Sequence, residues 1–148
     1  MEELYELRTY IETGKYQEAL LLLDEMEDMS LDDKINRISS FMEVLLVHLI
    51  KQAAEKKTTR SWEVSIRNAL RQIVKINKRR KAGGWYLTAQ ELRAALEETY
   101  EAALDSTSLE TLEGQYTAEE LDSIVDRTAI TALAWEKIQQ TQMHQNLP

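Results

Sequence analysis

The segment KKTTRSWEVSIRNALRQIVKINKRRK (residues 56–81) decides the fold class, because its apolar residues recur with the period of an α-helix. The residues that share one side of this helix are Trp62, Ile66, Leu70, Ile73 and Asn77. Basic residues occupy a different side, so the helix is amphipathic and its polar side is cationic. We therefore expect a helix over residues 61–81 whose apolar side lies in a hydrophobic core.

The rest of the chain is also typical of helices. Its single Pro is the last residue, it has only four Gly, and good helix formers such as Ala, Leu, Glu and Lys are common. Apolar periodicity predicts helices at residues 2–12, 16–29, 30–54, 61–81 and 88–104, and a last helix from residue 117 to about residue 141. The sequence thus predicts an all-α, single-domain, antiparallel bundle of about six helices over residues 1–141, followed by a frayed tail at residues 142–148.

Local signals mark several ends of these helices. Ser30, which is followed by two Asp residues, is the expected N-cap of the third helix. Thr88 and Thr117 each precede a Glu by three residues, a spacing that predicts capping boxes. Gly83 is the expected left-handed residue that ends the helix over residues 61–81.

Composition excludes several classes of function. The chain of 148 residues contains no Cys, which excludes disulfides, thiolate catalysis and zinc sites built on sulfur. No signal-peptide pattern follows Met1. The longest apolar run, residues 44–50, is far shorter than the ~20 residues that cross a bilayer. We therefore expect a cytoplasmic protein that does not enter a membrane.

Charge is distributed unevenly along the chain. Residues 1–50 carry a net charge of −8 and residues 82–148 a net charge of −9, whereas residues 51–81 carry +9. Within the basic segment, Arg67, Arg71, Lys75 and Arg79 recur at every fourth residue, with Lys78 beside them. This spacing places their side chains along one side of the predicted helix.

Two interpretations of this basic stripe remain open. In the first, acidic residues of neighbouring helices balance it within the fold; the candidates are Glu25, Asp28, Glu97, Glu98 and Glu101. In the second, the stripe is exposed and binds an acidic protein, or a nucleic acid through the segment Lys51 to Lys81. An isoelectric point near 4.9 and the lack of aromatic residues on that side disfavour nucleic acid.

The sequence contains no recognisable catalytic motif. Its two His residues, His48 and His144, are far apart, and neither belongs to a metal-binding pattern. His48 lies in the most apolar part of its predicted helix, which favours a core histidine with one hydrogen-bonding partner. We therefore expect no enzyme, no cofactor and no metal site, and keep a hydrolase with a site near His48 as an alternative.

Several stretches together resemble the bacterial family called domain of unknown function twenty-nine, which is common in cyanobacteria. They are DEMEDMS (residues 24–30), LLVHLIK (residues 45–51), RSWEVSIRNALRQI (residues 60–73), TYEAAL (residues 99–104) and QYTAEEL (residues 115–121). The stretch RRKAGGWYLT stands where that family has a turn with Pro, and the helix after Asp126 is longer than usual.

The resemblance implies an all-α fold and no known activity. It also singles out four residues as a structural signature, namely His48, Arg60, Trp62 and Tyr100, with Trp62 buried and Arg60 or Ser61 capping the connector before its helix. We hypothesise a small, uncharacterised helical protein that binds another protein, as yet unidentified, through the basic stripe. Assembly into an oligomer is left open.

Overall fold

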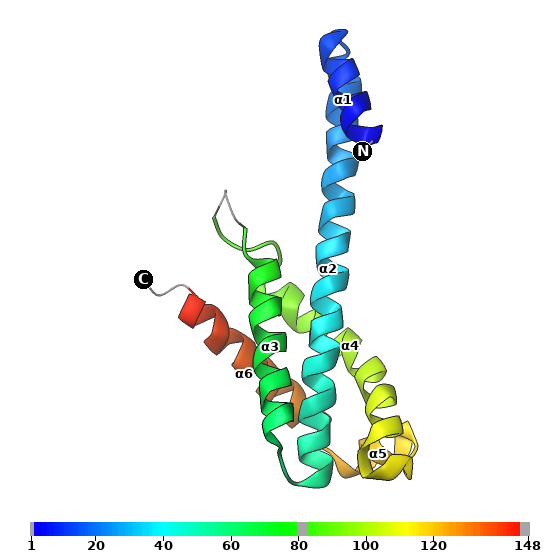
Figure 1. Cartoon of the computed structure of the whole chain (residues 1–148), viewed down its shortest axis with the longest axis vertical. Helices are drawn as coiled ribbons and strands as arrows, with labels where there is room; N and C mark the ends of the chain where they lie inside the picture. Colours follow the sequence, from blue (N-terminus) through cyan, green and yellow to red (C-terminus); the bar gives the residue numbers. More distant parts are fainter. Residues whose placement is uncertain (1, 80–82, 146–148) are drawn as a thin grey trace. The chain divides into compact units, whose positions relative to one another are not determined.

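The computed structural model describes residues 2–79 and 83–145. Its elements, in chain order, are α1 (Glu2–Glu12), α2 (Tyr16–Glu55), α3 (Arg60–Asn77), α4 (Ala89–Glu110), the short 3-10 helix η1 (Thr111–Gly114), α5 (Ala118–Ile124) and α6 (Arg127–Gln145) (Figure 1). These residues form no strand; their one β-bridge is isolated and joins Lys78 to Trp85. The prediction of an all-α helical bundle is confirmed.

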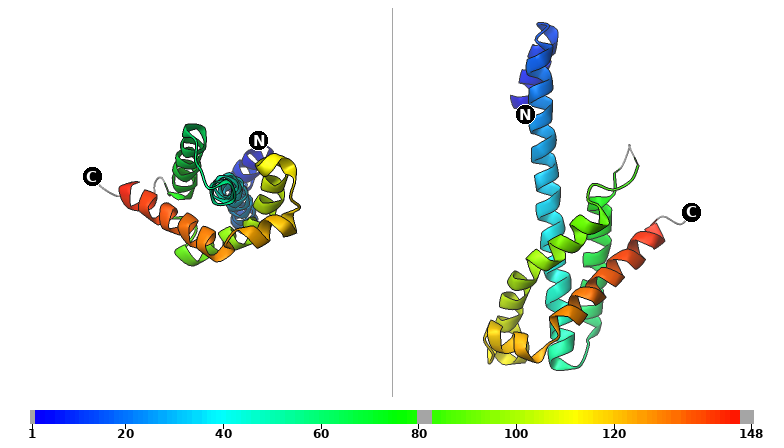
Figure 2. Two further views of the ribbon diagram at one scale, coloured as in Figure 1. Left: turned by 90° about the horizontal axis from the view of Figure 1, so that it is seen from below. Right: turned by 180° about the vertical axis from the view of Figure 1, so that it is seen from behind.

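The chain divides into two compact units, Met1–Asn36 and Arg37–Pro148. The first unit contains α1 and the beginning of α2, which lie side by side as an antiparallel hairpin (Figures 1 and 2). The second contains the rest of α2 and all later helices. A single domain over residues 1–141 stays a prediction. Helix α6 continues to Gln145, beyond the end expected near residue 141, and residues 146–148 lie outside the described residues.

The turn between α1 and α2 follows the signal in the sequence. Gly14 has a φ of +76°, a conformation that is accessible to Gly without strain from a Cβ atom. The N–H of Lys15 donates to the carbonyl of Tyr10 at 2.8 Å, and the N–H of Gly14 donates to that of Ile11 at 3.2 Å. These bonds satisfy carbonyls at the end of α1 and reverse the chain.

The prediction of a helix start at Ser30 was wrong. Helix α2 runs without a break from Tyr16 to Glu55, so Ser30 lies inside it. An N-cap residue acts only where the chain leaves helical geometry, and the good helix formers around Ser30 include no Gly or Pro that would force such a break. The two expected helices are therefore one.

Two further helix ends differ from expectation. Helix α4 reaches Glu110, not residue 104, and the segment directly after it forms η1. The expected last helix is two, because the chain leaves helical geometry at Val125. The carboxylate of Asp126 then accepts the N–H of Ala129 at 3.2 Å and so satisfies a free donor in the first turn of α6. Two expected helices are one helix, α2, and one expected helix is two, α5 and α6. The described residues therefore contain six α-helices, as expected.

The capping boxes are confirmed. Thr88 Oγ1 accepts the N–H of Glu91 and the Glu91 carboxylate accepts the N–H of Thr88, at 3.2 and 3.1 Å. Thr117 and Glu120 make the same exchange at the start of α5, with both bonds 3.2 Å long. Each box satisfies two backbone donors that would otherwise lack a partner at a helix start.

The hydrophobic core of the second unit is formed by the later part of α2, which is buried on more than one side at Leu45, Leu46 and Val47, and by one side each of α3, α4 and α6. Helix α3 packs against α6, and α4 packs against α5 and α6 (Figure 2). The buried residues of α3 are Ile66, Ala69, Leu70, Ile73, Val74, Ile76 and Asn77. This is the apolar side that the sequence predicts, with one difference: Trp62 is half-buried. Because this side of α3 is in the core, its basic side is left at the surface.

Candidate interaction surface

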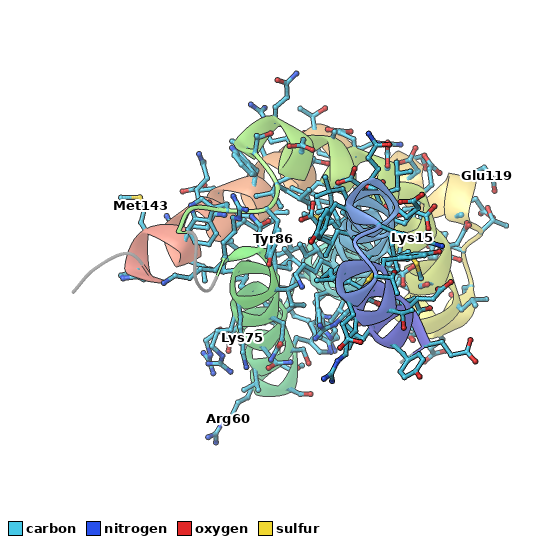
Figure 3. The ribbon with its side chains drawn as sticks, turned by 90° about the horizontal axis from the view of Figure 1, so that it is seen from above. Lys15, Arg60, Lys75, Tyr86, Glu119 and Met143 are labelled. Carbon is cyan, nitrogen blue, oxygen red and sulfur yellow. The ribbon has the colours of Figure 1, made fainter. Side chains whose placement is uncertain are left out.

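The basic face of α3, defined as Arg67, Arg71 and Lys75, is exposed to solvent. These three side chains are four residues apart, so they follow one line along the helix, and Arg60 extends the line at its N-terminal end. Figure 3 shows Arg60 pointing away from the bundle and Lys75 on the outer side of the same helix. The sequence correctly placed these bases opposite the core.

The basic face has no ion pair within the second unit. Among the described residues from 37 to 145, no carboxylate pairs with Arg67, Arg71 or Lys75. Glu101, one of the acids that could have balanced the stripe, pairs instead with Arg127. The face therefore presents three exposed cationic groups without an ion pair among these residues, an arrangement that suits a binding surface for an anionic partner.

Lys78 and Arg79 do not belong to the helical line, contrary to expectation. Helix α3 ends at Asn77, and Lys78 already has an extended backbone, with φ −78° and ψ 129°. Both side chains are exposed, and the Arg79 guanidinium lies 5.7 Å from the centre of the Tyr86 ring. Gly83 does have a left-handed φ of +76°, but it comes after the end of the helix. The expected helical residues 80 and 81 lie outside the described residues.

Asn77 explains why the helix ends early. Its side chain is fully buried, its Oδ1 accepts the N–H of Leu87 at 2.8 Å, and its Nδ2 donates to the carbonyl of Leu87 at 3.3 Å. Its own carbonyl accepts the N–H of Tyr86 at 2.8 Å. These bonds tie the returning chain to the end of α3, a distant pairing that helical periodicity does not reveal.

The Arg-Ser-Trp stretch of residues 60–62 has a structural role at the other end of α3. The N-cap is Thr59, whose Oγ1 accepts the N–H of Trp62 at 3.1 Å, so the expected capping by Arg60 or Ser61 was wrong. Lys51 Nζ and Lys57 Nζ each lie 5.9 Å from the centre of the Trp62 ring. At that distance both ammonium groups are attracted to the indole ring.

Ion pairs and a hydrogen bond extend this cluster to the end of α4. Lys51 pairs with Glu110 at 2.6 Å, and the Lys51 side chain is only 14% exposed. Thr111 Oγ1 donates to Glu55 Oε2 at 2.6 Å, and Lys57 lies 3.7 Å from the same carboxyl group. The family-like stretch therefore helps to join the end of α2, the start of α3 and the end of α4.

His48 makes one local hydrogen bond. Its Nδ1 lies 2.8 Å from the carbonyl oxygen of Val44, one turn earlier in α2, and the side chain is half-buried. Because a carbonyl oxygen only accepts, Nδ1 carries the proton in this contact. Within the described residues, no group of three or more His, Asp and Glu residues is placed to hold a metal ion.

Tyr100, the fourth signature residue, lies at a contact between α4 and α6. It is fully buried, and its hydroxyl has no hydrogen-bond partner among the described residues. Burial, followed by the negative charge of Asp122, raises the pKa of Tyr100 to about 12, while the positive charge of Arg127 acts in the opposite direction. The Arg127 guanidinium lies 4.5 Å from the centre of the Tyr100 ring.

Arg127 was not among the residues that the sequence singled out. Besides stacking on Tyr100, it pairs with Glu101 at 2.5 Å and donates to the carbonyl of Glu97 at 3.5 Å. A pocket of about 200 Å³ lies beside it; its lining includes Arg93, Arg127 and Trp135. The Arg93 guanidinium is 5.7 Å from the centre of the Trp135 ring. Both arginines thus connect α4 to α6, which indicates a structural role.

A family model described as domain of unknown function DUF29 matches residues 16–128 of the chain. The chain belongs to the DUF29 family. No curated protein and no solved structure matches it. The resemblance inferred from the sequence is therefore confirmed.

The DUF29 match places the features described above inside the family region. It covers α2 to α5 and the first residues of α6, including the basic face, the Arg-Ser-Trp stretch, Tyr100 and Arg127. Helix α1 lies before it. In the part of the chain that the structure describes, no helix combines the length and apolarity needed to cross a membrane.

Proposed function

We propose that this DUF29 protein is a non-catalytic binding module that holds an acidic segment of a partner protein on the basic face of α3. One observation carries the proposal: Arg67, Arg71 and Lys75 are exposed in a line and form no ion pair with the described residues between 37 and 145. Like charges at this spacing repel each other weakly. An anionic partner that binds between them relieves this repulsion, so the repulsion favours the bound state.

The regular spacing favours a helical acidic partner. Four residues advance an α-helix by about 6 Å, so acids at every fourth residue of a partner helix match the interval between the bases. An extended segment with acids at alternate residues, about 6.6 Å apart, comes close to the same interval, whereas irregularly placed acids do not match it. The geometry thus supports recognition of a repeated carboxylate pattern, and this repeat is the expected source of specificity.

Nucleic acid fits the basic face less well. The chain carries a net charge of −8, so most of its surface repels a phosphate backbone. Trp62, the aromatic residue of α3, is half-buried and held by Lys51 and Lys57, so it is not placed for stacking on a base. We therefore favour a protein partner, and nucleic-acid binding becomes an outcome of the test.

Capture of partners from native lysate tests the proposal. The bait variant carries Arg67→Glu, Arg71→Glu and Lys75→Glu. A matched variant carries the same charge change at three exposed bases elsewhere, Lys15→Glu, Arg37→Glu and Lys56→Glu. Acidic proteins that bind the wild type and the matched variant, but not the reversed face, support the proposal.

Two results would contradict it. If the reversed face still captures the same proteins and circular dichroism shows that it is folded, the basic face is not the binding surface. If a gel shift shows that the wild type binds RNA or DNA at low salt and the reversed face does not, the surface recognises nucleic acid.

A further inference from the structure

The hairpin of α1 and the beginning of α2 leaves much of its apolar surface uncovered. Helix α1 has no buried residue, and up to Asn36 the only buried hydrophobic residue of α2 among those described is Ala19. Large apolar side chains remain exposed, with Tyr16 at 64% and Leu20 at 61%. Contiguous exposed apolar surface is unusual on a protein that acts alone and marks interaction sites.

Five of the exposed apolar residues form one stripe on each helix, whereas Tyr5, Leu21 and Met29 are exposed on other sides. On α2, Tyr16, Leu20 and Leu23 are spaced at four and three residues, which places them along one stripe. On α1, Leu4 and Ile11 are seven residues apart and form a second stripe. The hairpin face is defined as these five residues.

The two stripes lie on the same side of the hairpin. The less exposed residues, Leu7 on α1 and Leu22 and Met26 on α2, mark where the helices face each other. In α1 the exposed stripe is rotated by about 50° from Leu7, and in α2 by about 110° from Leu22 and Met26, in the same sense along the chain. Because the helices run antiparallel, rotations in the same sense bring both stripes toward one face. A two-helix apolar face of this kind suits the apolar side of a third helix.

Charge selects the class of partner. Residues 1–36 contain eleven acidic and three basic residues, a net charge of −8. One of the three bases, Arg8, is already paired with Glu12 at 2.9 Å. On α2, Glu27 follows Leu23 by four residues and is exposed, so a carboxylate continues the apolar stripe. A second copy would bring together two units of the same charge, and an anionic lipid surface would be repelled.

We propose that the hairpin face binds a cationic amphipathic helix of a partner protein. The apolar side of that helix covers the five residues of the face, and its Lys and Arg side chains meet the surrounding carboxylates. This surface has the opposite charge to the basic face of α3 and takes a different partner. Each of the two proposals can therefore be contradicted without affecting the other.

Fluorescence anisotropy with the full chain tests this proposal. The probe is a labelled synthetic helix of Leu and Lys in an amphipathic order, with two controls: the same composition in scrambled order, and the same order with Glu in place of Lys. The wild type should bind the cationic amphipathic helix more tightly than either control. Raising the salt should weaken this binding, because exposed charges are screened.

Paired variants locate the binding surface. Tyr16→Gln with Leu20→Gln should weaken binding at least about tenfold, because two apolar contacts are lost. Leu109→Gln with Ile124→Gln, which removes two exposed apolar side chains from the second unit, should leave it unchanged. The thermal midpoint should not fall in either variant, since all four side chains are already exposed.

Four outcomes would overturn the proposal. The first is no binding of the cationic amphipathic helix, and the second is equal binding of the scrambled helix. The third is a clear fall in the thermal midpoint of the Tyr16→Gln, Leu20→Gln variant, because the face would then be packed within the molecule. The fourth is self-association of the wild type in sedimentation velocity that the same variant loses, because a second copy would then occupy the face.

Discussion

The guanidinium of Arg127 lies 4.5 Å from the centre of the Tyr100 ring, and this contact joins the first turn of α6 to α4. The same guanidinium pairs with Glu101, so one side chain makes both a ring contact and an ion pair to a single helix. Ile130, Ala134 and Ile138 of α6 are buried in the core as well. Arg127 therefore adds a polar contact at the first turn of α6 to the apolar packing that holds the rest of the helix.

Arg127→Ala should lower the free energy of unfolding by about 1–2 kcal/mol, because it removes the ring contact together with a partly exposed ion pair. Arg127→Lys keeps the positive charge near Glu101 but loses the flat contact with the ring, so it should recover less than half of the loss. Urea unfolding followed by circular dichroism measures both. An Arg127→Ala variant as stable as the wild type would show that the contact does not hold α6.

Tyr100 should make stability sensitive to alkaline pH. Its pKa is about 12 in the folded state against 10.0 ordinarily, so the unfolded chain releases this proton first as the pH rises. The contribution of Tyr100 to stability is complete below pH 10 and is lost as the pH rises towards 12. Unfolding measured at about pH 8 and about pH 11 should therefore show a larger loss for the wild type than for Tyr100→Phe.

At neutral pH, Tyr100→Phe should be at least as stable as the wild type. The hydroxyl is buried without a partner among the described residues, and removing such a group relieves a cost of about 1 kcal/mol or more. If Tyr100→Phe is markedly less stable than the wild type at about pH 8, the hydroxyl has a hydrogen-bond partner. If Tyr100→Phe loses as much stability as the wild type between about pH 8 and about pH 11, another group causes the alkaline loss.

Much of the fold followed from local sequence. The apolar period of α3 identified its buried residues, and the Thr88 and Thr117 capping boxes began helices as expected. These features depend on residues within one or two turns of each other, so a sequence displays them directly. The DUF29 resemblance was likewise carried by short stretches, and the family match confirms it.

What the sequence did not show depends on distant contacts or on competition between local signals. Asn77 appeared as a polar residue on an apolar side, and only its bonds to Leu87 explain its burial. Arg127 became important because Tyr100, 27 positions earlier in the sequence, lies beneath it. Ser30 carried a strong capping signal that the surrounding helix overrode, whereas Asp126 carried a similar signal that was missed.

Two substitutions at capping residues test whether α2 is one continuous helix, with the N-cap of α3 as the reference. Thr59→Ala should cost about 1 kcal/mol, because the N–H of Trp62 loses its acceptor at the start of α3. Ser30→Ala should be neutral or stabilising by up to about 0.5 kcal/mol, because Ala is the better helix former inside a helix. Urea unfolding of the two variants provides the comparison. Equal losses in both would mean that a helix does begin at Ser30.

Asn77→Ala should destabilise the protein by about 2–3 kcal/mol, because it leaves the buried N–H of Leu87 without its acceptor and frees the returning chain. Asn68→Ala, on the exposed side of the same helix, is the control and should change stability by less than about 0.5 kcal/mol. If thermal unfolding shows the same midpoint for both variants, the side chain of Asn77 does not hold the loop.

The most direct test of the basic face is its equilibrium affinity for an acidic helix. The probe is a labelled, alanine-based helical peptide with Glu at every fourth residue, and a control peptide has the same composition with the Glu residues in irregular positions. The variants are the reversed face (Arg67→Glu, Arg71→Glu, Lys75→Glu) and the matched reversal at Lys15, Arg37 and Lys56.

We predict that the wild type and the matched variant bind the regular peptide more tightly than the irregular one, with an affinity that falls as salt is added. The reversed face should bind at least about tenfold more weakly, since each lost charge pair contributes up to about 1 kcal/mol. Equal dissociation constants for the reversed face and the matched variant would contradict the assignment of α3 as the binding surface.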